Sequence, residues 1–178
     1  MNFFPEISFE FKNGILPFSI YLIIFIVTIF CFSKEKRTRL CSKKQTIYMS
    51  ISKIFTLLNI ILITFSKITN ETYLIVAGIV LFIIGSSIMV LSIINFCSTP
   101  INKVVTKGLY KYSRNPQMIG IWIIFLGIGI LINSILSILF LSFNIIFAHQ
   151  YIKAEEKFCV SNYKDEYKKY FKSVPRYF

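Results

Sequence analysis

The segment 73–96, YLIVAGIVLFIIGSSIMVLSIINF, decides the fold class because it carries no charged side chain and is long enough to cross a bilayer. A transmembrane helix needs about 20 apolar residues to span roughly 30 Å of hydrocarbon. Small residues, Gly78, Gly85, Ser86 and Ser87, offer surfaces on which a second helix can pack closely. The segment therefore predicts a transmembrane helix packed against a neighbour.

Four more apolar segments are predicted to span the membrane: 14–32, 47–66, 116–132 and 135–153. The last two are separated only by Asn133-Ser134, so they form either one overlong helix or a tight hairpin. We predict the hairpin, because a single helix would exceed the thickness of the bilayer by about half. Residues 154–178 follow as a tail. The expected fold is all-α: one polytopic membrane domain over 1–178, with about five transmembrane helices and a C-terminal amphipathic cytoplasmic helix.

The composition agrees with a membrane protein. Of 178 residues, 55% are hydrophobic and only 16% are charged, and the mean hydropathy of +0.66 is rare in a soluble domain. The net charge of +12 could indicate nucleic acid, but the cations alternate with apolar spans too long for a groove-reading module. The expected partner is a bilayer with an anionic inner leaflet, and no nucleic acid is expected.

The positions of Lys and Arg predict the orientation. Seventeen of the 20 lie in the first loop, in the segment 97–116 and in the tail from 153 onward, whereas only Lys12 and Lys67 lie on the other side. We therefore expect a multi-pass protein of a bacterial or archaeal cell membrane, with its N-terminus outside and its C-terminus in the cytoplasm. Lys53, inside the second span, is interpreted as a side chain that reaches the headgroups.

Two polar segments are then expected to meet on the cytoplasmic side. In the loop, Asn115-Pro116 has the residue types of a helix N-cap and first turn, and Arg114 offers a forked donor for a carboxylate or phosphate. Capping alone would also explain the Asn-Pro pair. The sequence leaves these two interpretations open.

The tail has an amphipathic pattern, with apolar residues at steps of three and four and lysines on another face. This favours a helix lying in the membrane interface with its lysines toward acidic lipids. Glu155 and Glu156 stand where the last span leaves the bilayer, a costly place for unpaired carboxylates. Lys153 and Lys157 are the nearest candidate partners in the sequence.

Metal and disulfide sites are not expected. The four cysteines, Cys31, Cys41, Cys97 and Cys159, stand far apart, and the chain has one histidine, His149.

The loop and the tail together resemble the membrane methyltransferases that include isoprenylcysteine carboxyl methyltransferases and phospholipid N-methyltransferases. The first family pattern, V-T-x-G-x-Y-x-x-x-R-[HN]-P-x-Y-x-G, is met by Val105-Thr106, Gly108, Tyr110, Arg114-Asn115-Pro116 and Gly120, with Met118 at the second Tyr. The second pattern, E-E-x-x-L-x-x-x-F-G-x-x-Y-x-x-Y-x-x-x-V-P-R, is met by Glu155-Glu156, Tyr163, Tyr167, Tyr170 and Val174-Pro175-Arg176. The resemblance covers roughly residues 95–178.

The resemblance implies an S-adenosyl-L-methionine site at the cytoplasmic ends of the last spans. The cofactor-binding residues that it implies are Asn95, Asn102, Lys103, Val104, Val105, Tyr110, Asn115, Pro116, Gln117, Met118 and Glu155. The catalytic residues that it implies are Arg114, Glu156 and Arg176, with no metal.

Some positions depart from the family pattern. Met118 replaces a Tyr, Lys164 replaces the Gly after the family's Phe, and Cys159 replaces a Leu. Tyr151 stands where isoprenylcysteine enzymes place an Arg for the substrate carboxylate. This disfavours a prenylcysteine carboxylate as substrate, unless Lys153 or Arg114 takes over from a nearby position.

The expected function is methyl transfer from S-adenosyl-L-methionine to a lipophilic or membrane-dissolved acceptor with an oxygen, nitrogen or sulfur nucleophile. One alternative is an NADPH-dependent membrane reductase of similar architecture. Another is a non-catalytic membrane protein in which Arg114, Glu155 and Arg176 form only structural ion pairs.

Overall fold

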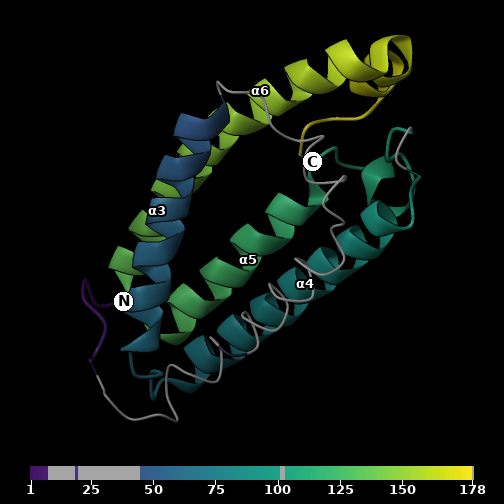
Figure 1. The fold of residues 1–178 in the computed structure, drawn as a ribbon. Coiled ribbons are helices and arrows are strands. Elements are labelled where there is room, and N and C mark those ends of the chain that lie inside the picture. Colours follow the sequence, from purple (N-terminus) through teal and green to yellow (C-terminus); the bar gives the residue numbers. More distant parts are fainter. Residues whose placement is uncertain (8–18, 20–44, 101–102, 178) are drawn as a thin grey trace.

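A computed structural model describes residues 1–7, 19, 45–100 and 103–177 (Figure 1). The predicted span 14–32, apart from Ser19, and the first cationic loop lie outside the described residues, as do Cys31, Cys41 and Asn102. The described elements are α3 (Gln45–Thr64), α4 (Thr72–Cys97), the 3-10 turn η1 (Gly108–Lys111), α5 (Pro116–Leu131) and α6 (Ile135–Ser173).

The described part of the chain is a helical membrane protein, as the sequence predicts. Three helices, α3, α4 and α6, are long and apolar enough to cross a bilayer, and α5 is a shorter apolar helix. Figure 1 shows α3 beside the first half of α6, and α4 beside α5. The second half of α6 extends beyond α3 and turns toward the end of α4 that carries η1.

The turn at Asn133-Ser134 separates α5 from α6, so the two apolar segments are two helices. Asn133 adopts a left-handed φ of 52°, which Asn tolerates better than most residues. Ser134 is the N-cap of α6, and its side chain accepts a hydrogen bond from the Ser137 backbone N–H. The backbone of Asn2 bonds to Asn133 and Ile135, which places the N-terminus at this end of the molecule.

Glycines allow α4 and α5 to approach closely. A Cβ added to Gly85 would lie 2.7 Å from the Ile124 nitrogen and 2.8 Å from the Gly120 oxygen. A Cβ added to Gly120 would lie 2.8 Å from the Met89 nitrogen. Backbone therefore meets backbone at this contact, as is common between membrane helices.

We expect Gly85→Ala to destabilise the protein by about 1–3 kcal/mol, because the added methyl meets main-chain atoms that cannot rotate away. The melting temperature in detergent measures the effect. Ser87→Ala, on an exposed face of the same helix, is the matched control and should change little. Equal melting temperatures for Gly85→Ala and Ser87→Ala would contradict the packing account.

Polar side chains join α3 to α6. The Asn144 amide donates to Ser52 Oγ at 2.9 Å and to Thr56 Oγ1 at 2.8 Å. Nearer the other end, the Asn59 amide donates to the Ser137 carbonyl at 3.1 Å, and Ser137 Oγ donates to Asn59 Oδ1 at 2.7 Å. Buried amides that find partners in this way fix how two apolar helices sit against each other.

The predicted boundary at 153–154 marks no break, since α6 continues to Ser173. The sequence between 150 and 158 contains no Gly or Pro that would end a helix. The interruption comes later, at Lys164, whose φ of 47° and ψ of −122° are not helical. Gly has the freedom for this conformation and a lysine does not, so the backbone here is strained.

We expect Lys164→Gly to stabilise the protein by about 1 kcal/mol, because the glycine has no Cβ to oppose a positive φ. Lys169→Gly is the control, since Lys169 is exposed within a regular part of α6 and glycine should weaken the helix there. Thermal unfolding of both variants checks the opposite signs. A lower melting temperature for Lys164→Gly would show that the turn is not strained.

Candidate functional site

A cavity of about 400 Å³ lies where the loop between α4 and α5 faces the second half of α6. Such a volume falls within the range of small-molecule sites. Its wall is formed by residues of α3, of the end of α4 and the loop, of the start of α5, and of α6. The lining residues are Met49, Lys53, Phe96, Thr99, Pro100, Lys103, Val104, Val105, Tyr110, Arg114, Asn115, Gln117, Met118, Tyr151, Glu155, Glu156, Cys159, Tyr163, Tyr167 and Tyr170.

The loop is held in place by the end of α4. Thr99 Oγ1 donates to the Asn95 carbonyl at 2.8 Å, and this closes the last turn of the helix. Gly108 has a φ of 59° and lies so close to Asn95 that a Cβ would come within 2.1 Å of its Nδ2. Only glycine fits both the conformation and the contact. Asn95 therefore packs against η1 and does not line the cavity.

The tail half of α6 packs onto this loop. Tyr167 and Tyr170 form a buried cluster with Val104, and the Tyr170 hydroxyl donates to the Tyr110 carbonyl at 2.7 Å. The apolar face of the tail thus contacts the chain itself, where the sequence favoured a lipid surface. Burial, followed by the nearby Tyr170 and Glu155, raises the pKa of the Tyr110 phenol, so this group stays protonated.

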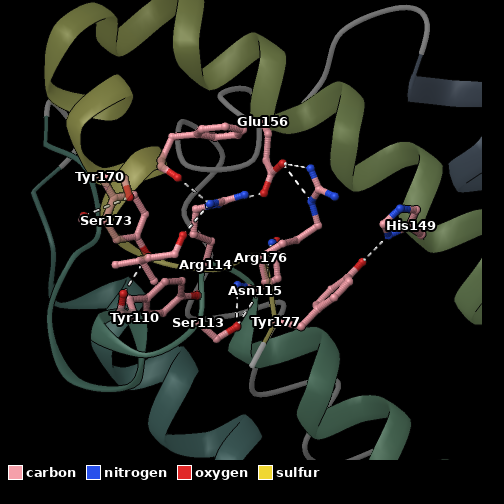
Figure 2. A network of polar contacts seen from close by, with 12 residues as sticks. Tyr110, Ser113, Arg114, Asn115, His149, Glu156, Tyr170, Ser173, Arg176 and Tyr177 are labelled. Atoms are coloured by element: carbon pink, nitrogen blue, oxygen red, sulfur yellow. Dashed lines mark hydrogen bonds and ion pairs between the residues drawn. The ribbon is translucent and has the colours of Figure 1, made fainter.

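Glu156 is the centre of a buried ion-pair network (Figure 2). Its Oε1 accepts from Arg114 Nε at 2.9 Å, and its Oε2 accepts from Arg176 Nε at 2.9 Å and from Arg176 Nη2 at 2.6 Å. The side chains of Arg114 and Glu156 are only 7% and 4% exposed. The predicted partners Lys153 and Lys157 are wrong for Glu156, because the two arginines occupy both carboxylate oxygens.

Arg114 also ties the end of α6 to the loop. Its Nη1 donates to the carbonyl of Phe171 at 2.8 Å and to the carbonyl of Val174, and its guanidinium carbon lies 4.1 Å from the centre of the Phe171 ring. Charge-assisted bonds of this kind are stronger than neutral ones. Most of the hydrogen-bond donors of this guanidinium are therefore used within the protein.

Residues 174–177, called the C-terminal strap below, return across the start of α5. The Arg176 carbonyl accepts from Ser113 Oγ at 3.1 Å and from Asn115 Nδ2 at 3.3 Å. The Tyr177 hydroxyl lies 3.0 Å from His149 Nδ1. Asn115 is the N-cap of α5 and Pro116 the first helical residue, as predicted, but the Asn115 side chain binds the strap and does not cap the helix.

Glu155 and Gln117, which both line the cavity, differ from Glu156 because each has an unpaired polar group. Among the described residues, the Glu155 carboxylate has no hydrogen bond or ion pair, although its side chain is partly buried. The Gln117 Nε2 atom is buried and also lacks a partner within the described part of the chain. Buried polar groups are rarely left unsatisfied in a folded protein. The Glu155 carboxylate is thus an acceptor available to a ligand, and the Gln117 amide is a donor left without a partner.

The structure brings most of the sequence-predicted site residues together. Those that line the cavity are Lys103, Val104, Val105, Tyr110, Arg114, Asn115, Gln117, Met118, Glu155 and Glu156. Of the predicted site residues that the structure describes, three do not line it: Asn95 packs on η1, Pro116 is buried in the first turn of α5, and Arg176 donates to the Glu156 carboxylate.

Other lining residues were not predicted as site residues. They include Met49 and Lys53 of α3, and Phe96, Thr99 and Pro100 at the end of α4. The tail tyrosines were assigned to an interfacial face, although their spacing already showed that they share one side of a helix. Tyr151 lines the cavity too, and its hydroxyl donates to Met118 Sδ at 3.0 Å. This contact joins two of the four positions that depart from the family pattern.

The chain is similar to known membrane methyltransferases. Residues 73–166 match the phospholipid methyltransferase family. A relative, the protein-S-isoprenylcysteine O-methyltransferase of Schizosaccharomyces pombe, is 38% identical over 73 residues, which are 40% of this chain and 31% of that protein. No solved structure matches the chain significantly. Because the family match covers more than half of the chain, including the loop and most of α6, the chain belongs to the phospholipid methyltransferase family.

Proposed function

We propose that this protein transfers a methyl group from S-adenosyl-L-methionine to a lipophilic or membrane-dissolved acceptor at the cytoplasmic face. The observation that carries this proposal is the ligand-sized cavity lined by Gln117 and by Glu155, whose carboxylate has no partner among the described residues. Membership of the family supports methyl transfer as the reaction.

The residues of the cavity fit this cofactor. When bound, S-adenosyl-L-methionine supplies a methyl group on a positively charged sulfur. The Glu155 carboxylate is suited to accept hydrogen bonds from its ribose or amino group, and the Gln117 amide is suited to donate to its carboxylate. The faces of Tyr110 and Tyr163 can attract a cation.

Most of the remaining residues assigned to cofactor binding line the cavity. Lys103, Val104, Val105, Asn115 and Met118 would contact the cofactor along the loop and the start of α5. The protonated Tyr110 phenol is not suited to act as a base. The chain chiefly orients the two reactants and keeps water out, and such positioning accounts for a large share of catalysis in transfer reactions. The assignments of Asn95, Asn102 and Pro116 stay predictions.

We assign positioning roles to Arg114, Glu156 and Arg176, which the resemblance implied as catalytic. The Glu156 carboxylate accepts three hydrogen bonds from the two arginines, and Arg114 uses its other donors on α6 and the strap. This network joins the strap to the loop and to α6 (Figure 2), and the loop and α6 form part of the cavity wall.

The proposed topology has five spans, with the N-terminus outside and the cavity facing the anionic inner leaflet. The arrangement of the two ends supports it. Residues 1–7, Lys67 and the Asn133 turn lie together at one end, where Lys67 pairs with Glu6 at 3.7 Å. The loop between α4 and α5, the tail and the strap lie at the other end. The assignment to a bacterial or archaeal membrane stays a prediction.

Binding and turnover of the purified full chain in dodecyl maltoside test the proposal. We expect S-adenosyl-L-methionine, and not NADPH, to raise the melting temperature. Methyl-labelled cofactor with a membrane lipid extract should give a labelled lipophilic product together with S-adenosylhomocysteine. Stabilisation by NADPH alone would favour a reductase, and the absence of binding by either compound would contradict the proposal.

A further inference from the structure

Lys53 is a charged residue in an otherwise apolar helix. It is the only Asp, Glu, Lys or Arg in α3, and it lines the cavity together with Met49, one turn earlier. Ionisable residues within membrane spans are costly, and they usually mark sites that handle a polar or charged ligand. The position of Lys53 on the cavity wall therefore indicates a role beyond the contact with lipid headgroups that the sequence suggested.

Within the described part of the chain, Lys53 is available to bind a ligand. Among the described residues, no acidic side chain pairs with it. Arg114, the guanidinium on the same cavity wall, is committed to Glu156 and to backbone carbonyls. Lys103 also faces the cavity, but it belongs to the loop assigned to the cofactor. Lys53 is thus the cation that α3 adds to the cavity wall.

The other candidate cations for an acceptor are not available. Tyr151 replaces the Arg of the family pattern, and its hydroxyl is bound to Met118 Sδ. Lys153 does not line the cavity. Lys53 lies outside the family match, which begins at residue 73. The match therefore says nothing about a role for Lys53.

We propose that Lys53 binds the anionic group, a carboxylate or a phosphate, of the methyl acceptor and so determines which acceptors this protein takes. The proposal rests on the proposed function. The ammonium group is a compact point charge with three donors, which suits either anion. Glu155 and Lys53 would then divide the cavity into a site for the cationic methyl donor and a site for an anionic acceptor.

Equilibrium binding to the full chain in dodecyl maltoside tests this proposal with three labelled probes of equal chain length. These are dodecanoate, dodecyl phosphate and the uncharged dodecanamide. We expect Lys53→Met to weaken binding of the preferred anion about tenfold, since one charge-assisted contact is lost, and to leave dodecanamide binding unchanged. Lys53→Arg, which keeps the charge, should stay within about threefold of the wild-type affinity.

Lys111→Met is the matched control, because Lys111 is exposed on η1 outside the cavity. It should bind all three probes as the wild type does. Equal anion binding by Lys53→Met and the wild type, or an equal loss of anion and amide binding, would overturn the proposal. Binding of S-adenosyl-L-methionine is measured in parallel, and we expect Lys53→Met to keep it. Failure of the wild type to bind the cofactor would contradict the proposed function. The binding of the three probes tests the role of Lys53 separately.

Discussion

Glu155→Gln should weaken binding of S-adenosyl-L-methionine by about 10- to 100-fold. The change keeps the shape of the side chain and replaces the unpaired carboxyl group, whose pKa burial and then Glu156 raise to about 7, with an amide. A hydrogen bond to a charged group contributes about 1.5–3 kcal/mol, which corresponds to this range of affinity. Isothermal titration of the purified variant measures the loss.

The stability of Glu155→Gln distinguishes a ligand-binding carboxylate from a structural one. Because Glu155 has no partner among the described residues, the cofactor-free variant should melt at the same temperature as the wild type or higher. Glu71→Gln, an exposed glutamate just before α4, is the control and should leave both binding and stability unchanged. A less stable Glu155→Gln protein with normal cofactor affinity would contradict the assignment.

Glu156→Gln, unlike Glu155→Gln, should destabilise the protein, with a loss of about 3–5 kcal/mol in the free energy of unfolding. Removing this carboxylate charge leaves Arg114 and Arg176 beside a neutral amide in a site that is almost closed to solvent. Breaking a buried ion pair by removing one partner typically costs this much. Denaturation in mixed detergent micelles measures the change.

Asp165→Asn is the control for Glu156→Gln. Asp165 pairs with Lys168 at 3.2 Å, but its side chain is 95% exposed, and surface pairs contribute little to stability. We expect this variant to lose less than about 1 kcal/mol. If Glu156→Gln were as stable as Asp165→Asn and lost only turnover, Glu156 would be a catalytic residue and not a positioning residue.

The helices could be predicted from the sequence because the physical signal is local. An uncharged segment such as 73–96 predicts a transmembrane helix by length and composition, and Asn133-Ser134 followed by an apolar segment predicts a turn. Hydropathy falls at about residue 153 while helix propensity does not, so the sequence did not show that α6 continues from the predicted span into the tail. The kink at Lys164 could not be read from the lysine itself, which normally favours a helix, although the family pattern has a Gly at this position.

The site was predicted in part, and what was missed depends on tertiary contacts. The family patterns placed Tyr110 and Glu155 on one cavity, but adjacency in the sequence could not show that Glu155 is unpaired while Glu156 is bound by two arginines. Lys53 was interpreted as a headgroup contact because hydropathy places it near the end of its span. Only the packing of α3 against α6 brings it to the cavity wall.

A structure of the full chain determined with S-adenosylhomocysteine is the most direct test of the central claim. The account predicts ligand density between the loop that carries Tyr110 and the α6 segment at Glu155, within hydrogen-bond distance of the Glu155 carboxylate and the Gln117 amide. Density at the opposite end of the molecule, beside Lys67 and the Asn133 turn, would contradict it. So would an empty cavity at a ligand concentration that saturates binding in solution.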